Sequence, residues 1–293
     1  MARIRVGISS WTEPTLVKSG WYPPDANTAE ERLRYYASRF PIAEIDSTFY
    51  AIPNEKTAQL WVERTPKDFV FNAKAYALLT QHPVPPSRLP KDLREKLGEK
   101  ESNVYFKDLG PKDEESVWDR FRDGMQPLQD AGKLGAIVFQ FPKWFLPSPA
   151  SYRFMEDLRE WMGDFGIAIE FRQASWLKDE RRERVLKFLK DHGFIYVVVD
   201  EPQGFPSSVP PVVARTAPLA MVRFHGHNAT NWEKKGITTA EKFRYLYKRE
   251  ELQAWVPKLR QLEKGASEVH AVFNNCFSDY AVRNAQDLAE LLG

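Results

Sequence analysis

The sequence lacks the features that would place a protein in a membrane or outside the cell. Its 293 residues include a single cysteine, so no internal disulfide can form, and a cytoplasmic location is expected. No apolar run approaches the roughly 20 residues that a membrane span needs. The first residues enter a strand-like pattern without the apolar segment of a signal peptide. We therefore expect no membrane partner.

An excess of charge of one sign is also lacking. The chain has 42 Lys and Arg against 40 Asp and Glu, a net charge of +2, which by itself does not drive binding to nucleic acid. The 43% hydrophobic and 28% charged residues are typical of a globular protein. Aromatic residues are abundant, with 9 Trp, 11 Tyr and 19 Phe.

Eight short β-rich runs alternate with helical patterns along the chain. Most of the runs are apolar nearly throughout, as is typical of parallel strands covered on both faces. The alternation predicts an α/β fold, a single TIM-type (β/α)8 barrel over residues 1–293. A doubly wound open sheet is the alternative, but no G-x-G-x-x-G follows the first run. The runs are Ile4–Ile8, Ile42–Thr48, Phe69–Lys74, Ala136–Phe141, Ile167–Phe171, Ile195–Val199, Ala220–His225 and His270–Asn274.

Three connections, residues 75–135, 201–218 and 226–239, are too long for plain barrel loops, and the first is the largest. Residues 75–135, between the third and fourth runs, hold the proline-rich stretch His82–Pro90 and a helical segment from Glu114 to about Ala131. Because this insertion follows a strand, it rises over the catalytic face of a barrel. We expect it to act as a lid, with a surface excursion as the alternative.

Polar side chains gather at the carboxyl ends of the predicted strands. Alternate residues of a strand share a face, and these polar sets are predicted to face the barrel axis. Burying such charges is costly unless they are paired, and Glu44 with Arg223 is expected to be mainly structural. The opposite end of the barrel is expected to lack charges, which favours a functional site over a self-satisfied network. The set comprises Glu44, Asp46, Lys74, Glu170, Arg172, Arg223 and His225, with the amides of Asn72, Gln140 and Asn275.

The same strand ends carry motifs that resemble the DUF72 (YecE-like) family. They follow one another along the whole chain as Gly7-Ile-Ser-Ser-Trp11, Glu44-Ile-Asp-Ser-Thr-Phe-Tyr50, Phe69-Val-Phe-Asn-Ala-Lys74, Glu170-Phe-Arg172, Arg223-Phe-His-Gly226 and Phe273-Asn-Asn275. The resemblance implies a TIM-type barrel and supplies no reaction. The chain departs from the family pattern twice. Gln173 stands where His commonly follows Glu-Phe-Arg, and Thr80-Gln81-His82 replaces Thr-His, which weakens any mechanism built on those two histidines.

The cations of the mouth predict an anionic substrate. Lys74, Arg172, Arg223 and His225 suit phosphate or carboxylate, and five loop tryptophans (11, 21, 144, 176 and 232) offer stacking surfaces of which at least one is expected to line the pocket. We expect acid/base chemistry, by a hydrolase or an isomerase or lyase, on a phosphorylated sugar, a nucleotide or a nucleic-acid end. The expected catalytic residues are Glu170, Asp46, His225 and Lys74. The expected substrate-binding residues are Arg172, Arg223, Trp11, Tyr50, Asn72, Gln140, Trp176 and Asn275.

Alternatives of other classes stay open. A metal-dependent phosphodiesterase or nuclease would draw ligands from Asp46, Glu170, His225 and His227, but the nearby cations compete and no cofactor is expected. Lys74 is either a Schiff-base nucleophile or an ion-pair partner of a nearby carboxylate. A non-catalytic nucleic-acid- or ligand-binding protein is the alternative outside enzymes, and the sequence does not indicate an oligomeric state.

Overall fold

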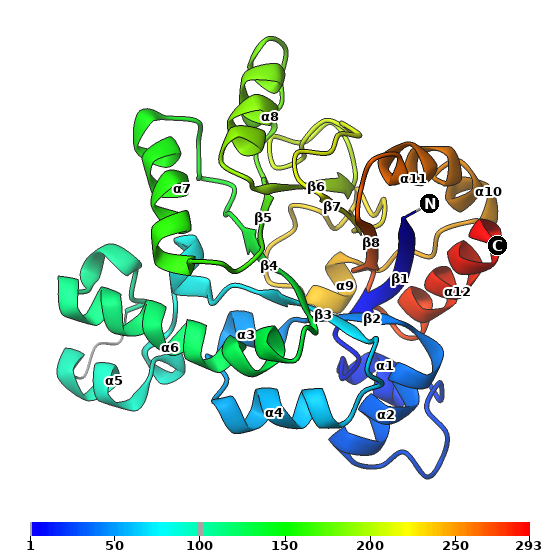
Figure 1. The fold of residues 1–293 in the computed structure, drawn as a ribbon, viewed down its shortest axis with the longest axis horizontal. Coiled ribbons are helices and arrows are strands. Elements are labelled where there is room, and N and C mark those ends of the chain that lie inside the picture. The colour runs from blue at the N-terminus through cyan, green and yellow to red at the C-terminus, as the bar shows by residue number, and fades with distance from the viewer. Residues whose placement is uncertain (1, 99–101) are drawn as a thin grey trace.

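The computed structural model describes residues 2–98 and 102–293 and shows a closed barrel of eight parallel strands in sequential order (Figure 1). β8 pairs with β1 and completes the ring. The prediction of a TIM-type barrel is therefore confirmed. The strands are β1 (Arg3–Ser9), β2 (Ile42–Ile45), β3 (Val70–Lys74), β4 (Leu134–Gln140), β5 (Ile167–Glu170), β6 (Ile195–Asp200), β7 (Leu219–Phe224) and β8 (Glu268–Phe273).

Helices cover the outside of the barrel (Figure 1). Local signals set several of their ends: Thr28 and Glu31 form a reciprocal capping box, and the Asn54 side chain accepts from Thr57 N. Within the described part of the chain, no helix is long and apolar enough to cross a bilayer. The helices are α1 (Pro14–Lys18), α2 (Ala29–Arg39), α3 (Ser47–Tyr50), α4 (Glu55–Glu63), α5 (Lys91–Leu97), α6 (Pro111–Asp130), α7 (Pro149–Met162), α8 (Arg181–Asp191), α9 (Thr239–Lys242), α10 (Arg249–Gln253), α11 (Val256–Glu263) and α12 (Tyr280–Leu292).

The second strand is shorter than predicted. β2 ends at Ile45 because Asp46 adopts a helical backbone conformation and α3 begins at Ser47. The Thr48 hydroxyl lies 2.9 Å from the Ile45 carbonyl oxygen and 2.6 Å from that of Lys74. Strand alternation therefore stops at Ile45, and it does not place Asp46 as predicted.

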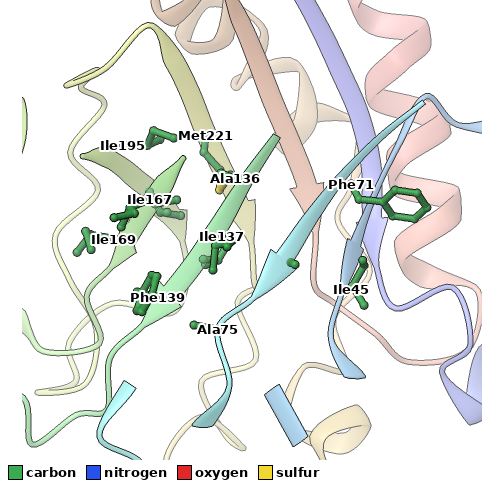
Figure 2. Close-up of a cluster of buried hydrophobic side chains, with 14 of the residues drawn as sticks. Ile45, Phe71, Ala75, Ala136, Ile137, Phe139, Ile167, Ile169, Ile195 and Met221 are labelled. Atoms are coloured by element: carbon green, nitrogen blue, oxygen red, sulfur yellow. The ribbon is translucent and has the colours of Figure 1, made fainter. Parts of the chain in front are cut away.

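The main apolar core lies between the barrel and its helices. Ile45, Phe71, Ile137, Phe139 and Ile169 are buried side chains of four neighbouring strands (Figure 2). Ile42, Val70 and Val272 form a separate small cluster. These side chains lie on the same faces of their strands as the polar residues, because residues two apart on a strand, such as Ile42 and Glu44, point the same way. The barrel interior is thus apolar only in part.

The amino end of the barrel also carries charges, so the expectation that it lacks them is wrong. Arg5 Nε lies 2.6 Å from Glu268 Oε1, and His270 Nε2 lies 2.9 Å from Glu268 Oε2. His270 Nδ1 contacts Asn72 Oδ1 at 3.0 Å. A Cβ at Gly135 would meet the His270 ring at 2.5 Å, so glycine makes room for it. Asn72 therefore belongs to the polar layer at the amino end of the barrel. A difference in charge between the two ends of the barrel does not by itself identify the functional site.

The insertion 75–135 packs against the barrel over much of its length. Its residues 76–80 are buried, Val84 and Val104 pair as an antiparallel bridge, and α6 packs against α4 as the crossover helix. Residues 99–101 of the insertion lie outside the described residues. The lid role expected for this segment stays a prediction.

Candidate functional site

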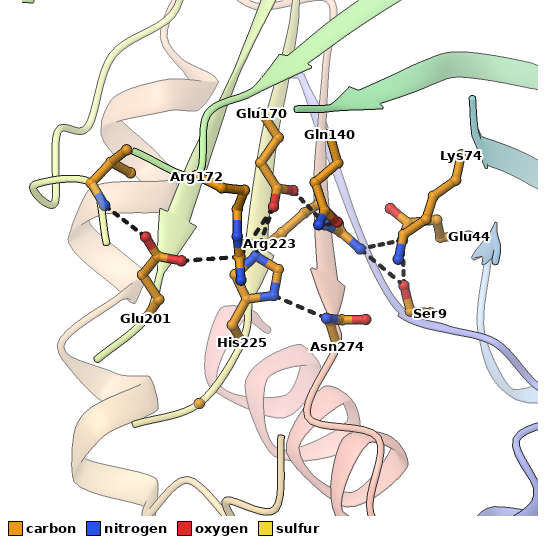
Figure 3. Close-up of polar contacts among 12 residues, drawn as sticks. Ser9, Glu44, Lys74, Gln140, Glu170, Arg172, Glu201, Arg223, His225 and Asn274 are labelled. Carbon is orange, nitrogen blue, oxygen red and sulfur yellow. Dashed lines mark hydrogen bonds and ion pairs between the residues drawn. The ribbon is translucent and has the colours of Figure 1, made fainter. Parts of the chain in front are cut away.

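A buried network of charges fills the carboxyl end of the barrel. Arg223 Nη2 lies 2.5 Å from Glu44 Oε1, and Arg223 Nη1 donates to Glu170 Oε2 (Figure 3). Gln140 Oε1 lies 3.3 Å from the same Nη1. Glu44, Glu170 and Arg223 have no exposed surface. The pairing of Glu44 with Arg223 that the sequence suggested is present.

Glu170 is an ionised carboxylate held by three neighbours. Burial alone would raise its pKa, but Arg223, His225 and Arg172 together hold the pKa of Glu170 well below its usual range. Arg223 and Arg172 each donate to it, and His225 Nε2 lies 3.2 Å from its Oε1. Both oxygens of Glu170 are therefore occupied by hydrogen-bond donors.

His225 is neutral, and a neighbouring amide fixes its tautomer. The Asn274 amide nitrogen lies 3.0 Å from His225 Nδ1. Because an amide NH2 can only donate, Nδ1 accepts and Nε2 carries the hydrogen directed at Glu170. Burial lowers the pKa of His225 to about 3. The sequence analysis selected Asn275 instead of Asn274, but the Asn275 amide donates to the Tyr245 carbonyl oxygen and to Asn284.

Lys74 and Asp46 form an ion pair at the edge of this network. Lys74 Nζ lies 2.8 Å from Asp46 Oδ1, with the two side chains 14% and 18% exposed. Burial would lower the pKa of Lys74, but the negative charges of Asp46 and Glu44 together outweigh burial and the pKa is raised. A Schiff-base nucleophile must be deprotonated. Of the two readings of Lys74, the structure therefore shows the ion pair.

Arg172 joins the buried network to the surface of the mouth. Its Nη1 lies 3.3 Å from Glu170 Oε1 and 3.1 Å from Glu201 Oε2, and its guanidinium stacks over the Trp232 ring at 4.6 Å. Glu201 Oε1 accepts from Val209 N at 2.8 Å. Burial raises the pKa of Glu201 to about 8. Glu201 was missed from the sequence, although it follows Asp200 at the end of β6.

A cavity of about 270 Å³ opens where these strand ends meet the loops. Two predicted substrate-binding residues, Gln140 and Arg172, line it together with Trp144 and Trp232. Burial and Arg172 lower the pKa of Lys242 to about 8. The charged residues that line the cavity are mainly basic. They are Glu233 and the cations Lys143, Arg172, Lys234, Lys235 and Lys242. The electrostatics of the cavity suit an anion.

His82 also lines this cavity. In the sequence, its shift by one residue from the family pattern weakened any mechanism built on this histidine. The extra residue, Gln81, adopts a left-handed backbone with φ 63°, and this turn brings His82 N within 3.0 Å of the Ala77 carbonyl oxygen. The structure therefore places His82 at the mouth despite the altered spacing.

Other predicted residues do not reach the cavity. Trp176 is buried between Phe171 and Phe145, with ring centroids at 4.4 and 5.5 Å, and its Nε1 donates to the Phe145 carbonyl. Tyr50 is 43% exposed and lies beneath Arg88. Within the described part of the chain, the cavity lining contains none of Trp11, Asp46, Tyr50, Asn72, Trp176 and Asn275.

Trp11 and Asp46 meet instead in a separate small hollow. Its volume is about 130 Å³, and Trp11 packs there against Trp61 and Phe71. Trp21 lies in another aromatic cluster with Tyr35 and Phe40. Of the five loop tryptophans, Trp144 and Trp232 are thus the two in contact with the candidate site.

A wider hollow of about 670 Å³ lies away from the strand ends, between the beginnings of α7 and α8. Tyr152, Arg184 and Phe188 contribute to its walls. Among the residues that the structure describes, no group of three or more His, Cys, Asp or Glu is arranged to hold a metal ion.

Comparisons with known proteins agree with this architecture. The model of the family described as "Protein of unknown function DUF72" matches residues 5–293. The UPF0759 protein YunF of Bacillus subtilis (strain 168) is 32% identical over 293 residues, 99% of this chain and 94% of that protein.

Solved structures give the same result. A DUF72 family protein from Enterococcus faecalis V583 is 28% identical, with TM-score 0.80 over 99% of this chain and 95% of that chain. A DUF72 family protein from Thermotoga maritima MSB8 is 27% identical, with TM-score 0.78 over 99% of each chain. The chain belongs to the DUF72 family.

Proposed function

We propose that the protein is an enzyme that binds a small phosphate- or carboxylate-bearing substrate in the cavity at the barrel mouth. The observation that carries this proposal is the state of Arg172. Its Nη1 is held by Glu170 and Glu201, whereas Nε and Nη2 have no hydrogen-bond partner among residues 2–98 and 102–293. An arginine anchored through one nitrogen keeps two donors for a ligand, and the guanidinium fork suits an oxyanion.

The buried residues support Arg172 and do not react themselves. Both Glu170 oxygens already accept hydrogen bonds, so Glu170 is badly placed to take a proton. His225 has both ring nitrogens engaged and is 1% exposed. We therefore assign Glu170, His225 and Arg223 to positioning, in place of the catalytic and substrate-binding roles expected for them. Catalytic groups belong among the residues that line the cavity.

The cavity walls favour a substrate that joins an anion to a ring. The Trp144 side chain is 52% exposed beside Lys143, and an exposed indole is a stacking surface for a base or a sugar. Lys234, Lys235 and Lys242 add positive charge. The cavity volume, about 270 Å³, is near the lower end of small-ligand pockets. Phosphorylated sugars and nucleotides share this chemistry, as does the phosphorylated end of a nucleic acid.

Isothermal titration calorimetry tests the proposal with inorganic phosphate, ribose 5-phosphate, AMP and a 5′-phosphorylated oligothymidine. We expect binding of the phosphate-bearing probes to be abolished in Arg172→Gln. The matched control is Arg184→Gln, which removes an arginine from the wider hollow and should leave binding unchanged. Loss of binding in the control but not in Arg172→Gln would move the site to that hollow.

Salt dependence separates the possible substrates. A single phosphate contact gives a shallow slope of log affinity against log salt, and a nucleic-acid strand that contacts several phosphates gives a steep one. We expect the shallow slope for AMP. Binding with no turnover of any phosphorylated probe, and a steep slope for the oligonucleotide, would favour a nucleic-acid-binding protein over an enzyme.

A further inference from the structure

We propose that His82 presents the lone pair of its Nε2 to the cavity as the proton acceptor of the site, and that an anion bound at Arg172 promotes protonation of the ring. This inference rests on the proposed function. The geometry points to His82 because it lines the cavity together with Arg172, Gln140 and Trp144. It replaces Glu170 as the general base.

The surroundings of the ring fix its orientation. His82 packs edge-on against Phe49 and Trp144, with ring centroids at 5.1 and 5.8 Å. Its Nδ1 lies 2.8 Å from Thr80 Oγ1, and Thr80 is fully buried. These contacts place the ring between an aromatic wall and a hydroxyl group. Among the described residues, Nε2 has no hydrogen-bond partner.

The Thr80 hydroxyl determines the tautomer. Thr80 Oγ1 lies 3.0 Å from the Ala77 carbonyl oxygen, a pure acceptor, and donates its one proton to it. The oxygen then accepts from His82 Nδ1–H. A neutral histidine with hydrogen on Nδ1 has a lone pair on Nε2, as a general base requires.

The charges around the ring keep it neutral when the cavity is empty. Burial, together with the positive charges of Lys74 and Arg172, lowers the pKa of His82 to about 4. The groups facing it include Lys74 on β3, paired with Asp46, Arg172 after β5, Lys143 after β4 and Lys242 on α9. An anion bound among these cations offsets their repulsion of a proton. The pKa of His82 then rises toward neutral pH, where proton transfer is most effective.

The proton moves from a hydroxyl group to His82 Nε2, and this transfer needs no cofactor. A hydroxyl group, of the substrate or of a water molecule, lies between Nε2 and the anion held by Arg172. As its O–H bond breaks, the proton forms an N–H bond with Nε2 and the electron pair stays on oxygen. The imidazolium then faces the bound anion, which stabilises it, until the proton returns to an oxygen atom and the neutral ring is restored.

Nuclear magnetic resonance of the whole protein labelled with ¹⁵N-histidine tests this inference. The sequence has five histidines, and the His82→Gln variant identifies the signals of His82. In the free protein we expect the Nδ1–H tautomer and a protonation midpoint below pH 5. Saturating inorganic phosphate should raise the midpoint by about one pH unit or more, corresponding to a tenfold or larger change in proton affinity. The same phosphate should leave the midpoint unchanged in Arg172→Gln.

The outcomes separate this inference from the proposed function. Phosphate binding that leaves the His82 midpoint unchanged, or an Nε2–H tautomer in the free protein, overturns the role of His82 while the anion site stands. Failure of phosphate to bind overturns the anion site and, with it, the charging of His82. His82→Gln should still bind phosphate, and Thr80→Val should shift the tautomer ratio toward Nε2–H, because valine offers no acceptor.

Discussion

Arg172 and Glu201 form an ion pair of 3.1 Å that lies against the face of Trp232. The carboxyl group of Glu201 is fixed from its other side by Val209 N at 2.8 Å. Because Glu201 belongs to the connection after β6 and Arg172 to the one after β5, the pair ties two loops of the mouth together. It also aims the guanidinium at the cavity. Under the proposed function, this one contact serves both stability and ligand binding.

Replacing Arg172 by glutamine removes the cation beside two buried carboxyl groups. Breaking a buried ion pair typically costs about 3–5 kcal/mol, but the pKa of Glu201, raised to about 8, leaves its carboxyl group largely protonated at pH 7, which reduces the loss. We expect Arg172→Gln to lower the free energy of unfolding by about 2 kcal/mol and to abolish phosphate binding. Urea unfolding at pH 7 and calorimetry measure the two effects.

A second substitution separates the effect on stability from the effect on phosphate binding. In Arg172→Gln/Glu201→Gln, the neutral amide at position 201 needs no cation, so part of the lost stability should return while phosphate binding stays absent. If the double variant regained phosphate binding, Arg172 would be a structural partner of Glu201 and not the ligand for the anion.

Glu201 makes the protein less stable as the pH rises. Its pKa is about 8 in the folded state and near 4.3 in an unfolded chain, so between these values the folded state binds more protons. The free energy of unfolding therefore falls with rising pH in this window, by up to about 1.4 kcal/mol per pH unit. Urea unfolding of the wild type and Glu201→Gln at pH 6, 7 and 8 measures it. From pH 6 to pH 8 the free energy of unfolding of the wild type should fall relative to that of Glu201→Gln, and a constant difference would contradict the prediction.

His225 makes the protein less stable as the pH falls. Its pKa is about 3 in the folded state and near 6.5 when unfolded, so the unfolded state binds more protons below pH 6.5. We expect the free energy of unfolding to fall by up to about 1.4 kcal/mol per pH unit as the pH drops from 6.5 toward 4. His225→Gln should weaken this dependence. His227→Gln is the contrasting variant. Because Asp200 raises the pKa of His227, this substitution should change the pH dependence of the free energy of unfolding above pH 6.5 instead.

The barrel was predictable because its signals are local and repeated. Each strand is an apolar run of suitable length, and residues such as Thr28 and Asn54 mark helix ends through their own side chains. The polar strand ends were predictable for the same reason, since Glu170, Arg172 and Arg223 follow the alternation of their strands. The pairing of Glu44 with Arg223 followed from burial alone.

Some positions could not be predicted from the sequence. They depend on the residue at which a strand ends and on how the loops after the strands fold back toward the cavity. A helical backbone at Asp46 ended β2 early. The parallel pairing of β7 with β8 continues from Phe224 and Phe273, so Asn274 and not Asn275 lies beside His225. Glu201 lies beyond a strand end, and His82 reaches the cavity by a turn at Gln81. Such positions depend on tertiary contacts that no short pattern encodes.

Trp144 provides the sharpest test of the substrate class. Base or sugar stacking on an aromatic ring is worth about 1–3 kcal/mol by alanine substitution, so Trp144→Ala should weaken AMP binding by about tenfold or more. Inorganic phosphate has no ring and should bind the variant as it binds the wild type. Because the side chain is 52% exposed, the melting temperature should change little.

Leu146→Ala is the matched control for this substitution. Leu146 lies two residues further along and is 51% exposed, but it does not line the cavity. Its variant should bind AMP and phosphate with wild-type affinity in the same calorimetric titrations. Equal weakening of AMP and phosphate binding by Trp144→Ala would mean that the indole shapes the anion site itself. An AMP affinity that Trp144→Ala leaves unchanged would mean that the ring of the substrate lies elsewhere, and that Lys143 and Lys242 face only its phosphate.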